Sequence, residues 1–293
     1  FYSIGSRLLL FTVILLLAQY LIIAYKDWRS LKKFSSNQIK MMADIKHSAF
    51  NHELNTYELM GKMILNNISK DEKIIKAFAA RDRKTLTELT LPLFDEMKKN
   101  YKAKQFHFHI PPAISFLRVH NPKKFDDDLS GFRKTILQAN SEKKEISGLE
   151  VGVTDLGFRV VKPLFDQTNK HIGSVEYGGD VNNDFIQAFI NNCSREVLEG
   201  GLNISVCART LDNTYKIIGS NFENDNSEDS AAIMEELGNK ESLIKIDGTN
   251  AAAYYPMYDF SGNIIGYSKF LYSIEEIQRS QTNFFIKTAA VLL

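Results

Sequence analysis

The residues that could do chemistry are concentrated between positions 104 and 133, where three histidines, two arginines, an aspartate run and a proline pair stand between short apolar runs. Arg118 lies in the middle of one of these runs. An unpaired buried guanidinium is costly, so Arg118 must be paired or must bind something. The planar guanidinium group can donate two parallel hydrogen bonds to the carboxylate of a ligand. The alternative is an internal ion pair with Asp126, Asp127 or Glu150.

His107 and His109 are two residues apart in a strand-like segment, so their side chains share one face. An H-x-H pair can bind a metal, but it needs a third ligand, and none has a diagnostic spacing; His120 is the nearest candidate. We therefore expect no metal here. His109 and His120 are expected either to donate hydrogen bonds in a binding pocket or to be structural histidines.

Further charged residues could face the same cavity. Arg133 lies early in a predicted helix, where it could equally form a salt bridge, and Arg159 alternates with apolar residues on a predicted strand. Glu150 and Glu176 suit a ligand amine. Arginine with glutamate would favour a zwitterion, whereas arginine with histidine would favour a plain anion. The candidate ligand-binding residues are Arg118, His109, His120, Phe116, Arg133, Glu150, Arg159 and Glu176.

Several other chemistries are excluded. The aspartates at 126–128 lack the spaced ligands and glycine of a calcium loop, and we interpret them as charge complementing a helix N-terminus. No nucleophile elbow, Walker loop, H-E-x-x-H or C-x-x-C motif occurs, so we expect no catalytic residue and no cofactor. A net charge of +1 argues against nucleic acid as a partner. Cys193 and Cys207 predict two buried free thiols, or else a single bridge.

Residues 8–25 form an uncharged apolar run, long enough for a transmembrane helix. A cleaved signal peptide would have a shorter apolar core and small residues at the cut, so a retained anchor is favoured. Tyr20, Tyr25 and Trp28 suit an interfacial aromatic belt. Basic residues are more frequent after the run than before it, but long domains cross the membrane largely regardless of charge.

Residues 284–286 and 289–293 resemble the start of a second span. Because the chain begins at Phe1 rather than Met and ends inside this apolar run, we expect it to be a piece of a longer protein. Two spans that bracket roughly 250 residues are the layout of a transmembrane receptor with an external domain.

Residues 27–68 predict one long helix, since they contain no proline and carry an apolar stripe at steps of four and three. The stripe could pack on its own domain or on a second chain. Ser69 with Glu72 predicts a capping box for the next helix, and Asp82 predicts the start of a third, which runs to about Asn100. The stripe consists of Phe50, Leu54, Tyr57, Gly61, Ile64 and Ile68.

From Gln105 onward the sequence predicts an α+β fold with antiparallel sheets. A succession of two strands, one helix and three strands occurs twice, and the Ile172-Gly173 pair is echoed by Ile265-Gly266. The first copy has strands at 105–110, 114–119, 146–153, 158–165 and 171–177, with a helix at 129–143 and turn signals at 154–157. The second follows a short helix at 182–193 and has strands at 202–208, 215–220, 243–246, 252–257 and 264–272, with a loop at 221–229 and a helix at 230–238.

Six segments are therefore expected. They are an N-terminal cytoplasmic stub (1–7), a transmembrane helix (8–25), a long signalling or dimer helix (26–68), a membrane-distal module (69–180), a membrane-proximal module (181–273), and an exit helix that starts a second span (274–293). Ser273 with Glu276 predicts a capping box for the exit helix.

The pattern F-H-x-P-P-x-x-S-F-L-R-x-H-x-P-x-x-F at 108–125, followed by DDLS at 127–130 and Phe132-Arg133, carries a family resemblance. It resembles the signature of a subgroup of double Cache sensor domains of bacterial transmembrane receptors. Gly148-Leu149-Glu150 with Gly152, and residues 172–176, match the same subgroup. The resemblance covers residues 28–281, although the second half carries little of the signature.

The resemblance implies two PAS-like modules between transmembrane helices, in a homodimer of the inner membrane with its sensor region in the periplasm. The distal module would hold a small molecule (a carboxylate, amino acid or amine), and the proximal one would relay the signal. The output would be that of a methyl-accepting chemotaxis protein first, or of a histidine kinase or diguanylate cyclase. The rival classes are a membrane-anchored enzyme and a structural dimeriser whose polar cluster is only an internal salt-bridge network.

Overall fold

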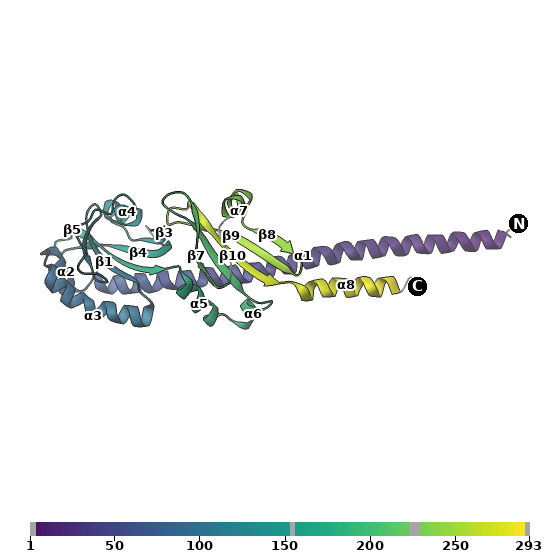
Figure 1. Ribbon diagram of the computed structural model, residues 1–293, viewed down its shortest axis with the longest axis horizontal. Helices are drawn as coiled ribbons and strands as arrows, with labels where there is room; N and C mark the ends of the chain where they lie inside the picture. Colours follow the sequence, from purple (N-terminus) through teal and green to yellow (C-terminus); the bar gives the residue numbers. More distant parts are fainter. Residues whose placement is uncertain (1–3, 153–155, 223–228, 291–293) are drawn as a thin grey trace.

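The structure, a computed structural model, describes residues 4–152, 156–222 and 229–290. It is elongated: the helix α1 (Ile4–Ile68) forms a spine, and two β-sheet modules lie one after the other along it (Figure 1). The first module is farthest from both termini. The last helix, α8 (Glu275–Ala290), returns beside α1, where the Tyr20 hydroxyl donates to the Thr288 carbonyl at 2.8 Å.

The two modules have the same strand order, β2-β1-β5-β4-β3 and β7-β6-β10-β9-β8, with antiparallel pairing throughout. The predicted α+β fold, with a long helix and two repeated sheets, is thereby confirmed. The first module contains α2 (Glu72–Ala79), α3 (Arg83–Tyr101), β1 (Gln105–Ile110), β2 (Ile114–Arg118), α4 (Lys134–Glu142), β3 (Ile146–Val151), β4 (Leu156–Phe165) and β5 (His171–Asp180). The second contains α5 (Asn183–Asn192), α6 (Arg195–Leu198), β6 (Asn203–Arg209), β7 (Tyr215–Ser220), α7 (Ser230–Leu237), β8 (Leu243–Asp247), β9 (Asn250–Tyr258) and β10 (Ile264–Ser273).

Helix α1 uses its apolar stripe to hold both modules. Its buried residues recur at steps of four and three from Ser35 to Ile68, as expected for one face of a helix. Of the predicted stripe only Ile64 is half-buried, because Leu65 faces the core instead. Gly61 allows close approach to the first sheet, since a Cβ there would lie 2.7 Å from the Tyr177 ring.

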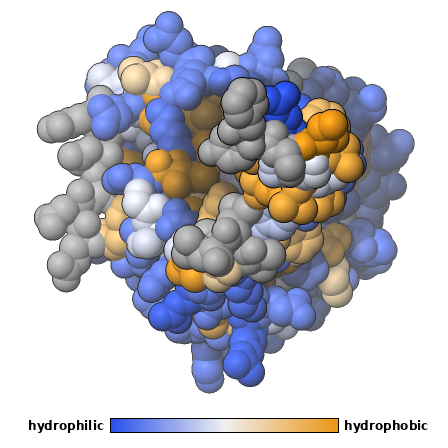
Figure 2. Space-filling view, turned by 90° about the vertical axis from the view of Figure 1, so that its right-hand side faces the viewer, coloured by the Kyte–Doolittle hydropathy of each residue, from blue (hydrophilic) through white to orange (hydrophobic). Residues whose placement is uncertain are grey.

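The N-terminal part of α1 projects beyond both modules. Among the described residues, α1 is the one helix long and apolar enough to cross a membrane, and none of its apolar window is buried. Figure 2 looks at this end of the molecule and shows apolar residues gathered on the projecting helices against a mostly hydrophilic body. The predicted second span begins in α8, whereas 291–293 lie outside the described residues.

Three predicted helix starts are wrong in detail. Helix α2 is capped by Asp71, which accepts from the backbone of Lys73 and Ile74, because Ser69 instead donates its hydroxyl to the Asn66 carbonyl in the last turn of α1. Helix α8 begins at Glu275, one residue later than the predicted box requires, and the Ser273 hydroxyl accepts from the Glu275 backbone at 3.3 Å. Asp82 caps α3 as predicted.

The third correction concerns the aspartate run. Helix α4 begins at Lys134 rather than near 129, because residues 129–133 form turns and the Leu129 backbone donates to the Ala113 carbonyl. The aspartates therefore do not complement a helix N-terminus. Asp128 accepts from the Ser130 backbone at 2.8 Å, and Asp127 has another partner, described below.

Other boundaries and the cysteines differ only slightly from expectation. Strand β3 ends at Val151, and Leu156 and Gly157 of the predicted turn already belong to β4. Residues 153–155 of that strand and turn, and 223–228 of the predicted loop, lie outside the described residues. Cys193 and Cys207 form no disulfide with any described residue, as the preferred prediction had it, although only Cys207 is buried and Cys193 is half-buried.

Two glycines at equivalent positions of the repeat let the central strands approach closely. A Cβ on Gly173 in β5 would lie 2.2 Å from the His109 carbonyl oxygen, and a Cβ on Gly266 in β10 would lie 2.0 Å from the Cys207 carbonyl oxygen. Both carbonyls follow irregularities in the strand register. Gly173 also has φ +140°, which side-chain-bearing residues rarely adopt.

Gly173→Ala is therefore expected to lower the free energy of unfolding by about 3 kcal/mol or more, since it combines a backbone clash with a strained conformation. Urea unfolding of the full chain in detergent measures this. The control is Gly131→Ala, where a Cβ meets nothing within 4 Å, so its effect should stay within about 0.5 kcal/mol. Equal effects of the two variants would contradict the close approach.

Candidate functional site

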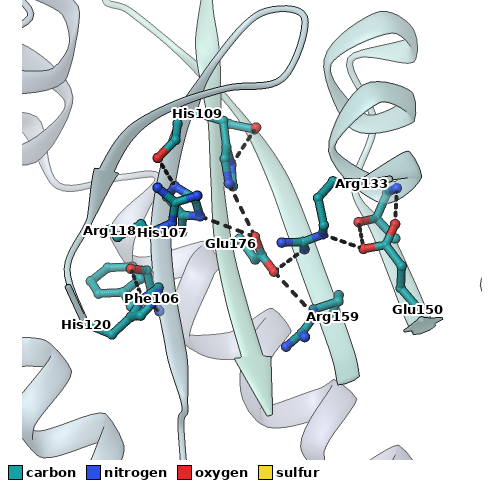
Figure 3. A network of polar contacts seen from close by, with 12 residues as sticks. Phe106, His107, His109, Arg118, His120, Arg133, Glu150, Arg159 and Glu176 are labelled. Atoms are coloured by element: carbon teal, nitrogen blue, oxygen red, sulfur yellow. Dashed lines mark hydrogen bonds and ion pairs between the residues drawn. The ribbon is translucent and has the colours of Figure 1, made fainter. Parts of the chain in front are cut away.

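The two faces of the first sheet differ in chemistry. One face is apolar and packs on α1, α2 and α3 through residues such as Phe106, Phe108 and Tyr177. The opposite face carries polar side chains from all five strands, including Ser115 of β2, which contacts His107. Helix α4 covers it by packing Ile136 and Ala139 against Val161, and residues 119–133 lead into that helix. A polar cluster is thus enclosed between sheet and helix (Figure 3).

Glu176 of β5 lies at the centre of this cluster and is fully buried. Its Oε1 accepts a hydrogen bond from Arg133 and is 3.7 Å from Arg159 Nε. Its Oε2 faces the histidines, 3.3 Å from His109 Nε2 and 4.0 Å from His107 Nδ1 (Figure 3). Burial alone would raise the pKa of Glu176, but Arg133, His109 and Arg159 outweigh it and hold this pKa well below its usual range.

Arg133 joins α4 to the sheet. Its Nε is 2.8 Å from Glu150 Oε2 on β3, while its other end reaches Glu176. Burial would lower the pKa of Arg133, yet the two carboxylates raise it, so the guanidinium stays charged. Glu150 also accepts from the Thr135 backbone and hydroxyl, both at 2.8 Å. The N-terminus of α4 is therefore fixed to β3 and β5 by charge-assisted hydrogen bonds.

Arg159 lies flat against the sheet. A Cβ on Gly157 would be 2.1 Å from its guanidinium carbon, and one on Gly178 would be 2.5 Å from Nη1. These glycines make room for the guanidinium between β4 and β5. Its Nη1 is 3.8 Å from Asp180, so Arg159 lies between two carboxylates.

His107 and His109 share the face, as predicted, with ring centroids 4.0 Å apart. His107 Nε2 is 2.8 Å from the Ser115 hydroxyl, and His109 Nδ1 is 3.4 Å from the Ser174 hydroxyl. Burial lowers the pKa of both histidines, that of His107 furthest, so both are neutral at pH 7.

Arg118 stands at the edge of the cluster and is paired internally. Its two terminal nitrogens bind the Asp127 oxygens at 2.5 and 2.7 Å, and it donates to the Lys124 carbonyl at 3.0 Å. The hydrogen bonds from Arg118 lower the pKa of Asp127. Of the three partners considered from the sequence, Asp127 is thus the one present.

The structure brings together His109, Arg133, Glu150, Arg159 and Glu176 (Figure 3). Two other candidates lie apart from Glu176: Phe116 packs against Phe78 under Arg83, and His120 Nδ1 is 3.3 Å from backbone atoms of Phe106. Any role in ligand binding stays a prediction for all eight residues.

Sequence reasoning considered His107 only as half of a possible metal-binding pair and left it out of the candidate list. It missed Thr135, Ser115 and Ser174. The shared face of His107 and His109 was visible from their spacing. The third group that faces them was not, because Glu176 is opposite His107 only through the pairing of β1 with β5.

Residues 35–277 match the sequence model of dCache_3, the double sensory domain of two-component sensor kinases. The chain belongs to this family. The predicted resemblance to double Cache sensors is therefore confirmed. As a double sensory domain, the matched region is a non-catalytic input module.

Solved structures share the fold of this double sensory domain. The extracellular domain of vpHK1S-Z8, described as a histidine kinase, is 14% identical, with a TM-score of 0.51 over 83% of this chain and 99% of that one. A domain of a sensory box/GGDEF family protein from Vibrio parahaemolyticus is 11% identical, with a TM-score of 0.51 over 84% and 98%. The periplasmic domain of LuxQ from Vibrio cholerae is 11% identical, with a TM-score of 0.48 over 80% and 98%. At such identities the likeness to the first two structures shows the fold alone. No curated protein sequence matches.

Glu176→Gln is expected to lower the free energy of unfolding by about 3–5 kcal/mol, because it removes the shared charge partner of two buried arginines. Urea unfolding of the full chain in detergent at pH 7 tests this. The matched control is Glu236→Gln, on an exposed pair with Lys245, which should leave the midpoint unchanged. A loss no larger than that of the control would show that Glu176 does not stabilise the cluster.

The histidines predict a pH dependence of stability. Their folded pKa values lie below the unfolded value of about 6.5, so the unfolded chain takes up protons first and the free energy of unfolding falls as pH drops below about 6.5. Each histidine contributes up to about 1.4 kcal/mol per pH unit between its two pKa values. His107→Gln should reduce the slope between pH 7 and 5 in EDTA, and the double variant with His109→Gln should reduce it further. If neither variant changes the slope, the two histidines do not cause the pH dependence of stability.

Proposed function

We propose that the chain is the extracytoplasmic sensory region of an inner-membrane receptor whose membrane-distal module binds a small anionic molecule. The observation that carries the proposal is the continuity of α1, which runs unbroken from an exposed apolar segment to the far module. Family membership supports the sensory role. The return of α8 beside α1 supports a layout in which both ends meet one membrane (Figure 1).

The proposed binding face is the polar side of the first sheet, under α4 and residues 119–133. Its charges are already paired, so a ligand must replace an internal partner. Asp127 is the partner best suited to leave, because its side chain is 37% exposed, whereas Glu150 and Glu176 are buried. A ligand carboxylate in place of Asp127 would keep Arg118 neutralised. It would also release residues 119–133, the covering segment, from this ion pair.

An anion fits this face better than a zwitterion. An amine would need Glu150 or Glu176, but Arg133 contacts both carboxylates, and the other oxygen of Glu176 is enclosed beside the buried His109 ring. Breaking that buried contact would leave an unpaired charge, which costs more than exchanging the half-exposed partner of Arg118.

The proposed signal reaches α1 through β5. Glu176 faces the polar cluster, while the next residue, Tyr177, packs on Gly61 of α1 on the other face of the sheet. A ligand that prefers one arrangement of the covering segment would shift α1 against α8 to the extent of its differential affinity. The exposed apolar residues Phe34, Met41, Leu59 and Met63 support a homodimer along α1.

The family description supports a two-component histidine kinase as the output, ahead of the chemotaxis protein that the sequence alone ranked first; a diguanylate cyclase is the further alternative. A second candidate function is a structural dimeriser. The completeness of the Arg118–Asp127 pairing favours it, since such a network needs no ligand.

Thermal unfolding of the full chain in detergent, against a panel of small carboxylates, amino acids and amines, is expected to single out a carboxylate. At 100 times its dissociation constant, a ligand adds about 2.7 kcal/mol, which raises the melting temperature by several degrees. Arg118→Ala should abolish the shift. Asp127→Asn removes the internal competitor and should tighten binding about two- to fivefold.

The matched control is Asp126→Asn, because Asp126 pairs with Arg83 and not with Arg118. This variant should leave the affinity unchanged. A panel without any shift, together with a large loss of stability in Arg118→Ala, would contradict the receptor proposal and support the structural dimeriser.

A further inference from the structure

His107, His109 and Glu176 converge on one point inside the first module. One ligand-type atom from each side chain lies within 4.8 Å of the other two, and all three residues are buried. The sequence pair H-x-H lacked a third ligand, and the neighbouring strand supplies it directly opposite His107. Figure 3 shows the His107 and His109 rings on one side of the Glu176 carboxylate and Arg133 and Arg159 on the other.

The distances suit a tetrahedral metal ion. Bonds of about 2.0–2.2 Å place tetrahedral ligand atoms about 3.4 Å apart. His109 Nε2 and Glu176 Oε2 are already 3.3 Å apart, and His107 Nδ1 is 4.0 Å from the same oxygen. The third distance, between the two imidazole nitrogens, is at most 4.8 Å. It must shorten by less than about 1.5 Å, which small rotations of the side chains can supply.

The outer contacts orient both imidazoles. Serine hydroxyls lie near His107 Nε2 and His109 Nδ1, on the side of each ring away from Glu176. When each serine oxygen accepts the ring N–H, the lone pairs of His107 Nδ1 and His109 Nε2 face the carboxylate. This second contact to the non-binding nitrogen is the usual support of a metal-binding histidine.

The polar atoms at the centre lack another partner. Glu176 Oε2 and His109 Nε2 are shielded from solvent and have no hydrogen bond of good geometry within the described residues. The two arginines contact Oε1, whereas the histidines face Oε2. Arg133 and Arg159 stand against the three carboxylates of Glu150, Glu176 and Asp180, so this group of charges keeps one net negative charge for a cation.

We propose that His107, His109 and Glu176 bind a divalent transition-metal ion of the zinc class. Two imidazoles and one carboxylate are ligands that Zn²⁺, Co²⁺, Ni²⁺ and Cu²⁺ accept, and three protein ligands leave one coordination position open. The site goes beyond the proposed sensing of an organic anion. Arg118 and Asp127 take no part in it, so the two proposals can fail separately.

The test uses the full chain in detergent, purified without a polyhistidine tag and stripped with EDTA. Titration with Co²⁺ should give the visible absorption of a tetrahedral Co²⁺ centre with a stoichiometry of one, and Zn²⁺ should displace it. Zn²⁺ should also raise the melting temperature. His109→Gln should weaken binding by more than about 100-fold, and Ser115→Ala, which keeps all three ligands, by about 10–100-fold.

Two controls make the result specific. His171→Gln changes a histidine of β5 that lies beside Phe165 and should leave metal binding unchanged. Arg118→Ala should do the same, although it abolishes the carboxylate response. A chain that gives no stoichiometric Co²⁺ spectrum, or an unchanged spectrum in His109→Gln, overturns the metal site and means that only a proton lies between the histidines and Glu176.

Discussion

The first module depends on keeping one carboxylate charged without solvent. Glu176 is buried in the middle strand of the sheet, where an ion alone would be prohibitively costly. Arg133 and Arg159 provide the compensating charge, and the His107 and His109 rings enclose the other side of the carboxylate. This requirement explains why α4 begins where it does, since its N-terminus must deliver Arg133.

The same strand connects this polar cluster to the helix that leaves the module. Along β5 successive side chains point to opposite faces, so Glu176 and Tyr177 place the buried charge and the α1 contact one residue apart. The second module holds α1 as well: the Tyr272 hydroxyl donates to the Ile39 carbonyl, and the buried Lys46 donates to the carbonyls of Val197 and Glu199. The buried charge is therefore one residue away from a contact with α1, the helix that both modules contact.

The two modules share a topology but differ in what fills the equivalent face. In the second module, α7 packs Ile233 and Leu237 against Tyr254 and Tyr267, so this face is mostly apolar. Cys207, whose carbonyl meets Gly266 as that of His109 meets Gly173, is part of this apolar group. The repeat thus preserves the backbone arrangement, while the buried cluster of paired charges lies in the first copy.

The sequence by itself determined the apolar helix, the order of strands and helices in both copies, and the set of charged residues that could share a buried face. These are local properties, because the helical period of 3.6 residues and the strand period of 2 residues can be recognised in consecutive residues. Only the tertiary structure decided which strands are neighbours, and hence that Glu176 meets His107 and that Arg118 selects Asp127 among three carboxylates. It also decided that Asp71 rather than Ser69 caps α2. Alternation along a strand fixes the face of a side chain but not its partner across strands, because pairing depends on contacts between distant parts of the chain.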